Sequence, residues 1–384
     1  MKDLKKALSQ LQQQGLYRRR RCLQGPQGRE IILDGHRLLN FSSNDYLGLA
    51  NHPDVVRSFK QAADQYGVGS GSAHLVNGHS RPHQQLEDAL AEFTGYPRAL
   101  LFSTGYMANL AVAQSLCSQG DYIIEDRLNH ASLLDAAKLS GGKLMRHLHL
   151  DYQSLEKKLQ RCDKGEILVS SDAVFSMDGD AVNIRQWLDS AQQKNAWCML
   201  DDAHGFGVLG NQGRGSLSEQ QIDSSQLHIY MATLGKAIGT SGAFIAASED
   251  LIEYLIQTAR SYIYTTAMPP ATAQASLSSL KLLIEEPHRQ QSLRDNITLF
   301  KQLSLQAGLP VMPSDSAIQP VMIGPADKAL AISQQLFTKG LHIAAIRPPT
   351  VPKNTARLRI TLRADHTSSD LQQLVEQLHS LLKQ

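Results

Sequence analysis

The sequence predicts an α/β fold: a mainly parallel β-sheet with helices on both faces, plus a smaller C-terminal α+β domain. Short apolar runs rich in β-formers recur at residues 99–102, 122–124, 167–169, 197–200, 227–232 and 243–246. Most are separated by helix-length amphipathic stretches, such as residues 108–117, 132–139 and 184–194. This alternation favours parallel strands that are covered by helices on both sides.

We expect three regions along the chain. Residues 1–50 form an N-terminal segment that begins as a polar helix and ends in a stretch dense in turn formers. Residues 51–280 form a large domain that contains the sheet and binds the cofactor, and residues 281–384 form a small C-terminal domain. The strand candidates of that last domain are residues 318–323, 343–346 and 358–362, and its final helix carries leucines on one stripe.

The composition is ordinary for a globular enzyme, with 42% hydrophobic and 19% charged residues. The formal net charge of +2 gives no general attraction to nucleic acid or to a membrane, so we expect neither as a partner. The four cysteines form no Cys-x-x-Cys pair, which argues against a zinc site or a disulfide framework and favours a reducing compartment. Because we find no signal peptide and no membrane-spanning run, we expect a cytoplasmic protein.

One lysine follows the apolar run at residues 227–232. The run leads into Thr233 and then into Lys236, which is surrounded by glycines. Scarce water at the end of a buried strand disfavours a charged amine, so we expect the pKa of Lys236 to fall. Lys236 is therefore a candidate for Schiff-base formation with an aldehyde cofactor such as pyridoxal 5′-phosphate (PLP). Taken alone, a lysine that merely extends out of a turn is the simpler interpretation.

Residues after the other apolar runs suit the same cofactor. In an open α/β sheet, ligands bind beyond the carboxyl ends of the strands. Gly105 opens a helix whose N–H groups would hold a phosphate, and Asp201 would keep the pyridine nitrogen protonated. His130 would cover the face of the ring. Further donors for the phenolic oxygen and the phosphate are His204, Ser176 and Thr233.

Three rival interpretations are weaker. Residues 205–210 match the Gly-x-Gly-x-x-Gly pattern, but the residues that follow would break the required helix, which disfavours a nicotinamide oxidoreductase. A phosphate-binding P-loop ending at Lys236 would need a glycine where the chain has Tyr230 and a hydroxyl where it has Ala237. His147 and His149 have no third ligand nearby in the sequence, so we expect no metal site.

Several motifs make the chain similar to the α-oxoamine synthases, PLP enzymes of fold type I that condense an amino acid with an acyl thioester and release carbon dioxide. The matching segments extend from residue 40 to residue 352 and include residues 129–132, 175–179 and 201–205. The resemblance implies an aspartate aminotransferase-like fold with a seven-stranded sheet, PLP as the cofactor, and a homodimer. It makes Lys236, His130 and Asp201 the catalytic residues.

Cofactor contacts beyond those residues are also implied by the resemblance. Gly105 and Tyr106 would contact the phosphate. Thr265 and Thr266 would reach the phosphate of the cofactor in the neighbouring subunit. Phe206 stands where a smaller residue is common in the family, which changes the expected shape of the pocket nearby.

Substrate contacts follow from the same resemblance. Arg347 would hold the amino-acid carboxylate, and Arg18 and Thr350 would contact the substrate together with His130. Arg18 belongs to a run of four arginines, so Arg19 is an alternative for its role. That run also suits the phosphates of coenzyme A or an acidic carrier surface.

Three features indicate the substrates within the family: residues 78–80, Asp180 and residues 346–352. They favour L-alanine and a pimeloyl thioester, carried either by acyl carrier protein or by coenzyme A. The alternative is a glycine C-acetyltransferase (2-amino-3-oxobutyrate CoA ligase), which would take glycine and acetyl-CoA. A non-catalytic binding paralogue is disfavoured because Lys236, Asp201 and His130 are all present.

Overall fold

The computed structural model describes residues 1–13 and 16–383 and divides into two compact units. The large unit contains residues 49–176 and 180–290, and the small unit contains residues 1–48, 177–179 and 291–384. The N-terminal segment therefore groups with the C-terminal part of the chain. The chain passes from one unit to the other after Gly48, Ser176, Gly179 and Gln290.

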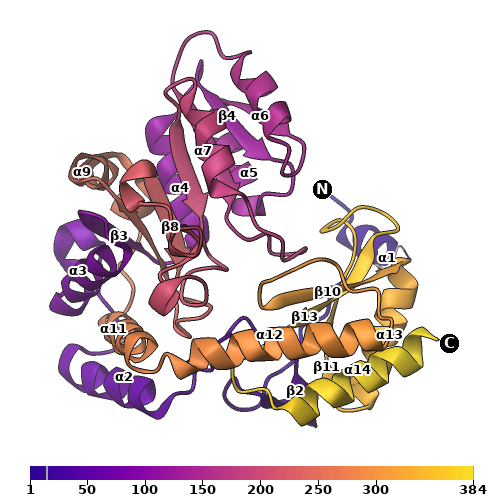
Figure 1. The fold of residues 1–384 in the computed structure, drawn as a ribbon. Helices are drawn as coiled ribbons and strands as arrows, with labels where there is room; N and C mark the ends of the chain where they lie inside the picture. Colours follow the sequence, from indigo (N-terminus) through magenta and orange to yellow (C-terminus); the bar gives the residue numbers. More distant parts are fainter. Residues whose placement is uncertain (14–15, 384) are drawn as a thin grey trace. The chain divides into compact units, whose positions relative to one another are not determined.

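A seven-stranded sheet forms the centre of the large unit (Figure 1), with strand order β3-β9-β8-β7-β6-β4-β5. Strand β9 is antiparallel to both of its neighbours, and the remaining pairs are parallel, which confirms the predicted sheet. The strands are β3 (Arg98–Phe102), β4 (Tyr122–Asp126), β5 (Lys143–His147), β6 (Ile167–Asp172), β7 (Trp197–Asp201), β8 (Ile229–Thr233) and β9 (Ala243–Ala247).

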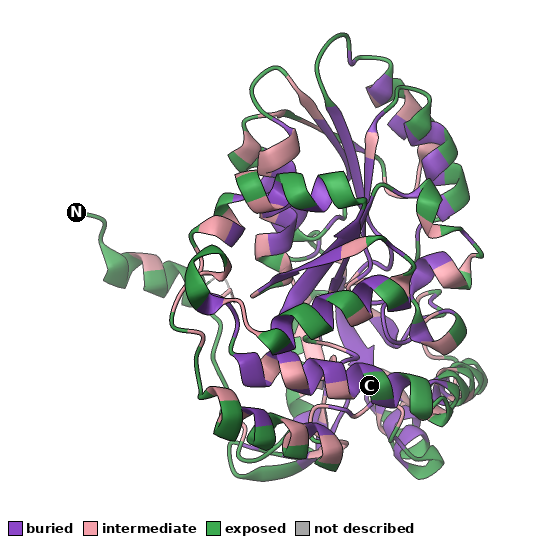
Figure 2. Ribbon diagram, turned by 90° about the vertical axis from the view of Figure 1, so that its left-hand side faces the viewer, coloured by how far each residue is buried: buried purple, intermediate pink, exposed green. Residues whose placement is uncertain are grey.

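Helices cover both faces of this sheet. Alternate strand residues such as Leu100, Leu168 and Met199 pack in one apolar cluster with α4, α5, α9 and α10, while α3, α6 and α7 also contact the strands. In Figure 2 the strands are buried and the outer sides of the helices are exposed. The helices of the large unit are α2 (Pro53–Tyr66), α3 (Arg81–Thr94), α4 (Gly105–Leu116), α5 (Ala131–Ser140), α6 (Tyr152–Leu159), α7 (Ile184–Gln192), α8 (Ser216–Glu219), α9 (Glu249–Thr258), α10 (Arg260–Ile263) and α11 (Pro270–Glu285), with short turns η1 (His74–Gly78), η2 (Asn211–Gly213) and η3 (Ser224–Gln226).

Strand β5 was not among the apolar runs that the sequence analysis named. It lies at the edge of the sheet, pairs with β4, and exposes Lys143 and Arg146. Charged side chains are common on edge strands because they discourage pairing with another chain. The strand therefore lacks the continuous apolar pattern of the buried strands β6 and β9.

The small unit contains two three-stranded sheets, in the orders β1-β2-β11 and β10-β13-β12. The predicted strand at residues 343–346 was wrong in part, because the chain changes sheets at Ile343: β11 pairs with β2, and β12 pairs with β13. Ile343 is buried, and its carbonyl accepts a hydrogen bond from Ser333 Oγ (2.6 Å). The elements are β1 (Glu30–Leu33), β2 (His36–Asn40), β10 (Ile318–Gly324), β11 (Leu341–His342), β12 (Ala344–Ile346), β13 (Ala356–Thr361), α1 (Leu4–Gln13), α13 (Ala326–Thr338) and α14 (Ser368–Leu382), together with α12 (His288–Gln306) from Gln291 onward.

Three residues from the middle of the chain complete the small unit. Asp178 makes an ion pair with the buried Arg357 of β13. Gly179 accepts a hydrogen bond from Ser314 Oγ (2.9 Å) through its carbonyl. A Cβ at Gly179 would stand 2.5 Å from the Ile318 carbonyl oxygen, so the close approach requires glycine.

The described residues contain no disulfide bond and no membrane-spanning helix. All four cysteines are free, and Cys117, Cys162 and Cys198 are buried. Among the helices of residues 1–13 and 16–383, none is both long enough and apolar enough to cross a bilayer.

Candidate active site

A cavity of about 200 Å³ lies within the large unit, where strands β3, β4, β6, β7 and β8 end. Parallel strands bring their carboxyl ends to one edge of a sheet, which is why residues far apart in the sequence meet there. The residues that line the cavity are Gly105, Tyr106, His130, Ser132, Asp172, Val174, Ser176, Asp201, Ala203, His204, Met231, Thr233 and Lys236.

Lys236 and His204 lie next to each other in this cavity. The Lys236 amine lies 2.9 Å from His204 Nε2, within hydrogen-bond distance. Thr233, at the end of β8, holds the turn before the lysine: its hydroxyl donates to the Gly242 carbonyl (3.0 Å) and accepts from the Gly235 N–H (3.2 Å). The turn closes because Gly239 has φ +73°, and a Cβ there would stand 2.4 Å from the Ala50 nitrogen.

Asp201, at the end of β7, is held by helix α4. The Asn109 amide donates to Asp201 Oδ2 (2.9 Å) and to Ser132 Oγ (2.8 Å). The Ala203 N–H donates to Asp201 Oδ1 (3.1 Å). Because Asn109 is buried and joins two residues of the cavity wall, it fixes the direction of the Asp201 carboxylate.

His130 caps helix α5 with its ring. His130 Nδ1 accepts from the Ser132 N–H (3.3 Å), so the proton of the neutral ring resides on Nε2. The backbone N–H of His130 donates to Asp172 Oδ2 (3.0 Å), which ties the cap to the end of β6. Burial lowers the pKa of His130, with Lys236 adding to that effect and Asp201 opposing it.

Asp172 and Asp202 are further buried acids at the strand ends. Burial and the neighbouring Asp201 raise the pKa of Asp172 well above its ordinary range. Asp202 accepts hydrogen bonds from Ser216 N (2.7 Å) and the Tyr230 hydroxyl (2.8 Å), and burial raises its pKa to about 6. These bonds anchor the residue that directly follows Asp201.

The first turn of α4 offers backbone donors to an anion. Thr104 caps the helix, and its hydroxyl accepts from the Met107 N–H (3.2 Å). Gly105 and Tyr106 line the cavity directly after this cap. The first N–H groups of a helix have no partners within the helix, and the dipole there favours negative charge, so this end suits a phosphate.

The loop that carries Ser176 is fixed by a histidine between two acids. His149 Nδ1 lies 3.0 Å from Asp126 Oδ1, and His149 Nε2 lies 2.8 Å from Asp180 Oδ2. Burial lowers the pKa of His149, but its hydrogen bonds and charge interactions with both carboxylates outweigh burial and raise it to about 9. The ring also packs edge-on against Phe175, with centroids 4.5 Å apart.

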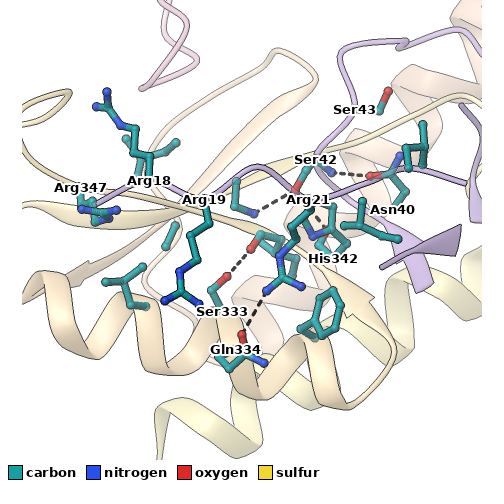
Figure 3. A pocket seen from close by; sticks show the side chains of 18 of the residues that line it. Arg18, Arg19, Arg21, Asn40, Ser42, Ser43, Ser333, Gln334, His342 and Arg347 are labelled. Atoms are coloured by element: carbon teal, nitrogen blue, oxygen red, sulfur yellow. Dashed lines mark hydrogen bonds between the residues drawn. The ribbon is translucent and has the colours of Figure 1, made fainter. Parts of the chain in front are cut away.

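Of the four predicted substrate residues, His130 lines the cavity that contains Lys236, whereas Arg18, Arg347 and Thr350 line a larger cavity of about 1160 Å³ in the small unit. Arg18, Arg19, Arg21, Arg347 and Thr350 are among its lining residues, and Arg20 is not. Figure 3 shows Arg19 and Arg21 directed toward the helix that carries Ser333 and Gln334, whereas Arg18 points away from that helix. Arg21 donates to Gln334 Oε1 (3.2 Å), and Arg347 donates to the Tyr17 carbonyl (2.9 Å).

Comparison with known proteins matches this arrangement to one family. Residues 36–378 match the family model of aminotransferase class I and II. The 8-amino-7-oxononanoate synthase of Stutzerimonas stutzeri is 53% identical over 376 residues, which is 98% of this chain and 96% of that protein. The chain belongs to the 8-amino-7-oxononanoate synthase family.

A further family member and two solved structures are also similar to this chain over most of its length. The 8-amino-7-oxononanoate synthase of Pseudomonas savastanoi pv. phaseolicola is 52% identical over 98% of this chain and 95% of that protein. A solved 8-amino-7-oxononanoate synthase from Francisella tularensis has a TM-score of 0.79 at 34% identity and covers 90% of this chain and 98% of its own. A serine palmitoyltransferase from S. paucimobilis, with a bound PLP–myriocin aldimine, has a TM-score of 0.93 at 27% identity over 99% of this chain and 96% of its own. The predicted family resemblance and the fold-type-I architecture are confirmed.

In this family member, most of the predicted cofactor residues meet in the smaller cavity. The exceptions are Thr265 and Thr266, which do not line it; Thr266 forms an isolated bridge with Ala73. Asn109 and Asp172 were not predicted to have a role in the site. Asn109 is one helical turn after Gly105, so a 3.6-residue period would have placed both on one face of α4.

Proposed function

We propose that this chain is a PLP-dependent acyltransferase of biotin biosynthesis. It would condense L-alanine with a pimeloyl thioester, and the products would be 8-amino-7-oxononanoate, carbon dioxide and the free thiol carrier. The observation that carries the proposal is that Lys236 and Asp201 line one cavity. The chain that holds them is about half identical in sequence to 8-amino-7-oxononanoate synthases.

The residues of the cavity fit PLP. Asp201 lines the cavity, and the Asn109 amide holds its Oδ2 (2.9 Å), so the carboxylate is fixed as an acceptor for a donor on a ligand. A protonated pyridine nitrogen is such a donor. The amine of Lys236, the first turn of α4 and the hydroxyls of Ser176 and Thr233 supply the other groups that this cofactor needs.

Each of these residues would have a distinct task. Asp201 would hold the proton on the pyridine nitrogen, and the N–H groups near Gly105 and Tyr106 would bind the phosphate. When bound, PLP withdraws electrons from the amino-acid Cα and makes its proton acidic. Lys236 would hold the cofactor covalently, and its released amine would take that proton. His204, 2.9 Å from this amine, would keep it directed into the cavity.

His130 would act on the second substrate. Its lowered pKa keeps the imidazole neutral near pH 7, and the Ser132 N–H occupies Nδ1. The proton on Nε2 would then donate a hydrogen bond to the thioester carbonyl and stabilise the charge that develops on its oxygen. The same flat ring would cover the cofactor.

Substrate carboxylates would be bound by the arginines of the small unit. Arg347 would hold the carboxylate of alanine, because a guanidinium forms two parallel hydrogen bonds to a carboxylate. Arg18 and Thr350 would contact the substrate as well. Arg19 lines the same cavity, so it stays an alternative to Arg18.

A substrate-pair assay tests the proposal. Purified protein with PLP would be given either L-alanine plus pimeloyl thioester or glycine plus acetyl-CoA, with the product identified by mass. We expect 8-amino-7-oxononanoate from the first pair and little product from the second. Faster turnover of the second pair would support the glycine C-acetyltransferase alternative, and no product from either pair would refute the acyltransferase proposal.

The assembly and the carrier stay predictions. We infer a homodimer in which Thr265 and Thr266 reach the cofactor phosphate of the partner, and a cytoplasmic location. Pimeloyl groups on acyl carrier protein and on coenzyme A would be compared at equal concentration, and the lower KM would identify the carrier. Light scattering with PLP would test the dimer, because a monomer that remains fully active would exclude a shared site.

A further inference from the structure

Three histidines meet on the large unit, apart from the cavity that contains Lys236. His74 begins the π-helical turn η1, His79 follows that turn, and His83 lies in the first turn of α3. One ring nitrogen from each residue lies within 4.8 Å of the others. His74 Nδ1 and His79 Nδ1 are 2.9 Å apart. None of the three residues lines the Lys236 cavity.

The turn between His74 and His79 closes only because residue 78 is glycine. A Cβ on Gly78 would stand 2.0 Å from the Ser72 carbonyl oxygen, which no side chain permits. The backbone is further fastened by the Gly78 N–H, which donates to the Ala73 carbonyl (3.0 Å). This closure brings two histidines that are five residues apart into ring contact, with centroids 5.1 Å apart.

Hydrogen bonds orient the lone pairs of two of the three rings. His83 Nε2 lies 2.7 Å from the Met268 carbonyl, which only accepts, so this nitrogen carries the proton and Nδ1 has the lone pair. His79 Nε2 likewise lies 3.3 Å from Gln84 Oε1, an acceptor, so Nε2 carries the proton and Nδ1 has the lone pair. A histidine that binds a metal through one nitrogen commonly donates from the other to a carbonyl, and His83 has that arrangement.

The charge state of the cluster also suits a cation. Burial and the neighbouring histidines lower the pKa of His74 to about 3, so its ring is neutral, as a metal ligand must be. Burial lowers the pKa of His83 as well. The buried carboxyl of Glu87 lies 4.0 Å from His79 Nε2, so an acid stands beside the cluster.

We propose that His74, His79 and His83 form a binding site for one zinc-type divalent transition-metal ion per chain. Zinc binds three protein ligands and a water in a tetrahedron with Zn–N distances of about 2.0–2.1 Å, which places the nitrogens roughly 3.4 Å apart. The His74–His79 contact would open slightly, and the proton that joins the two Nδ1 atoms would move from His74 Nδ1 to its Nε2. His83 Nδ1 would exchange its contacts with the Ser80 N–H (3.0 Å) and the Ser80 hydroxyl (2.9 Å) for the metal. This inference does not depend on the proposed function.

The metal would brace one loop of the large unit. His83 holds the Met268 carbonyl, and Ala73, beside His74, forms a bridge with Thr266. A bound ion would therefore fix residues 266–268 to the start of α3. The effect of metal is expected on the rigidity of this loop and on thermal stability, because ligands that bind the native state raise its stability.

The test uses tag-free PLP-loaded protein treated with a chelator and then titrated with Zn²⁺ by calorimetry, and with Co²⁺ by visible absorption. We expect one site per chain and an increase in the melting temperature. His79→Gln should weaken Zn²⁺ binding at least about 100-fold, because it removes a ligand and not merely an outer contact. His288→Gln, at an exposed histidine outside the cluster, should leave binding unchanged.

Two results would overturn the proposal. One is the lack of saturable Zn²⁺ and Co²⁺ binding at one ion per chain in the unaltered protein, which would leave a cluster joined only by hydrogen bonds. The other is binding that survives in a folded His79→Gln protein. Circular dichroism of the variant checks its fold, and the measurement on the unaltered protein decides the question if the variant does not fold.

Discussion

His149 between Asp126 and Asp180 gives the large unit a pH-dependent stability that can be measured. Both ring nitrogens face carboxylate oxygens, at 3.0 and 2.8 Å, so both carry protons and the ring is an imidazolium. The pKa is about 9 in the folded protein against an ordinary value of about 6.5. Since each pH unit of difference corresponds to about 1.4 kcal/mol, the charged ring stabilises the folded state by roughly 3 kcal/mol.

The direction of the effect follows from the raised pKa. The stabilisation is fully present below about pH 6.5, where both folded and unfolded chains hold the proton. It is lost as the pH rises through about 9, where the folded state releases the proton. Near pH 7.7, about half of it remains.

Urea unfolding of the unaltered protein and of His149→Gln, from pH 6 to pH 10, measures the stabilisation that the charged His149 ring provides. The difference in unfolding free energy should shrink by roughly 3 kcal/mol across that range. A constant offset from the lost packing against Phe175 does not affect the slope. The exposed His288→Gln control should run parallel to the unaltered protein. If the unfolding free energy of His149→Gln changed with pH in the same way as that of the unaltered protein, the ion-pair argument would be refuted.

Four further predictions concern the two cavities. Lys236→Ala should abolish turnover and the visible absorbance of covalently held PLP; an active variant would remove Lys236 from its role. Asn109→Ala should lower the unfolding free energy by about 2–4 kcal/mol, because it removes a hydrogen bond to the Asp201 carboxylate and another to the Ser132 hydroxyl, and a smaller loss in urea unfolding would contradict that explanation. In urea unfolding, Gly239→Ala should lower the unfolding free energy by about 2–5 kcal/mol, because alanine disfavours the positive φ and its Cβ would clash with the backbone at Ala50. Gly235→Ala is the control: its Cβ would meet atoms no closer than 3.6 Å, so the unfolding free energy should fall by less than about 1 kcal/mol. Arg18→Gln should raise KM for the pimeloyl thioester about tenfold, from the loss of a charge-assisted hydrogen bond, whereas Arg185→Gln, at an exposed arginine that lines neither cavity, should leave KM unchanged.

The sheet and the cavity could be predicted because both depend on local patterns. Each buried strand is an apolar run, and the polar residue that ends the run lies at the ligand-binding edge by the geometry of parallel sheets. Asp201 and Thr233 are such residues, and both line the cavity. The Lys236 turn was marked by its glycines, and Gly239 has the positive φ that glycine permits.

Other features depend on contacts that no local pattern records. Strand β5 carries charges because it lies at an edge, so its composition resembles a loop. The change of sheets at Ile343 arises from pairing with β2, about three hundred residues earlier in the chain. His74, His79 and His83 are spaced five and four residues apart across a π-turn and a helix start, and neither helix nor strand periodicity brings such a set together.

The three-segment composition of the small unit has a consequence for synthesis on the ribosome. The large unit has its whole chain once residue 290 has been made, whereas residues 1–48 and 177–179 must wait for residues 291–384. Until then, β2 lacks β11, the apolar side chains of Ile31, Leu33 and Leu38 lack Phe337, and Asp178 lacks Arg357. We expect nascent chains that stall or end before residue 337 to expose an unpaired strand edge that is prone to aggregation. Such chains should therefore bind chaperones.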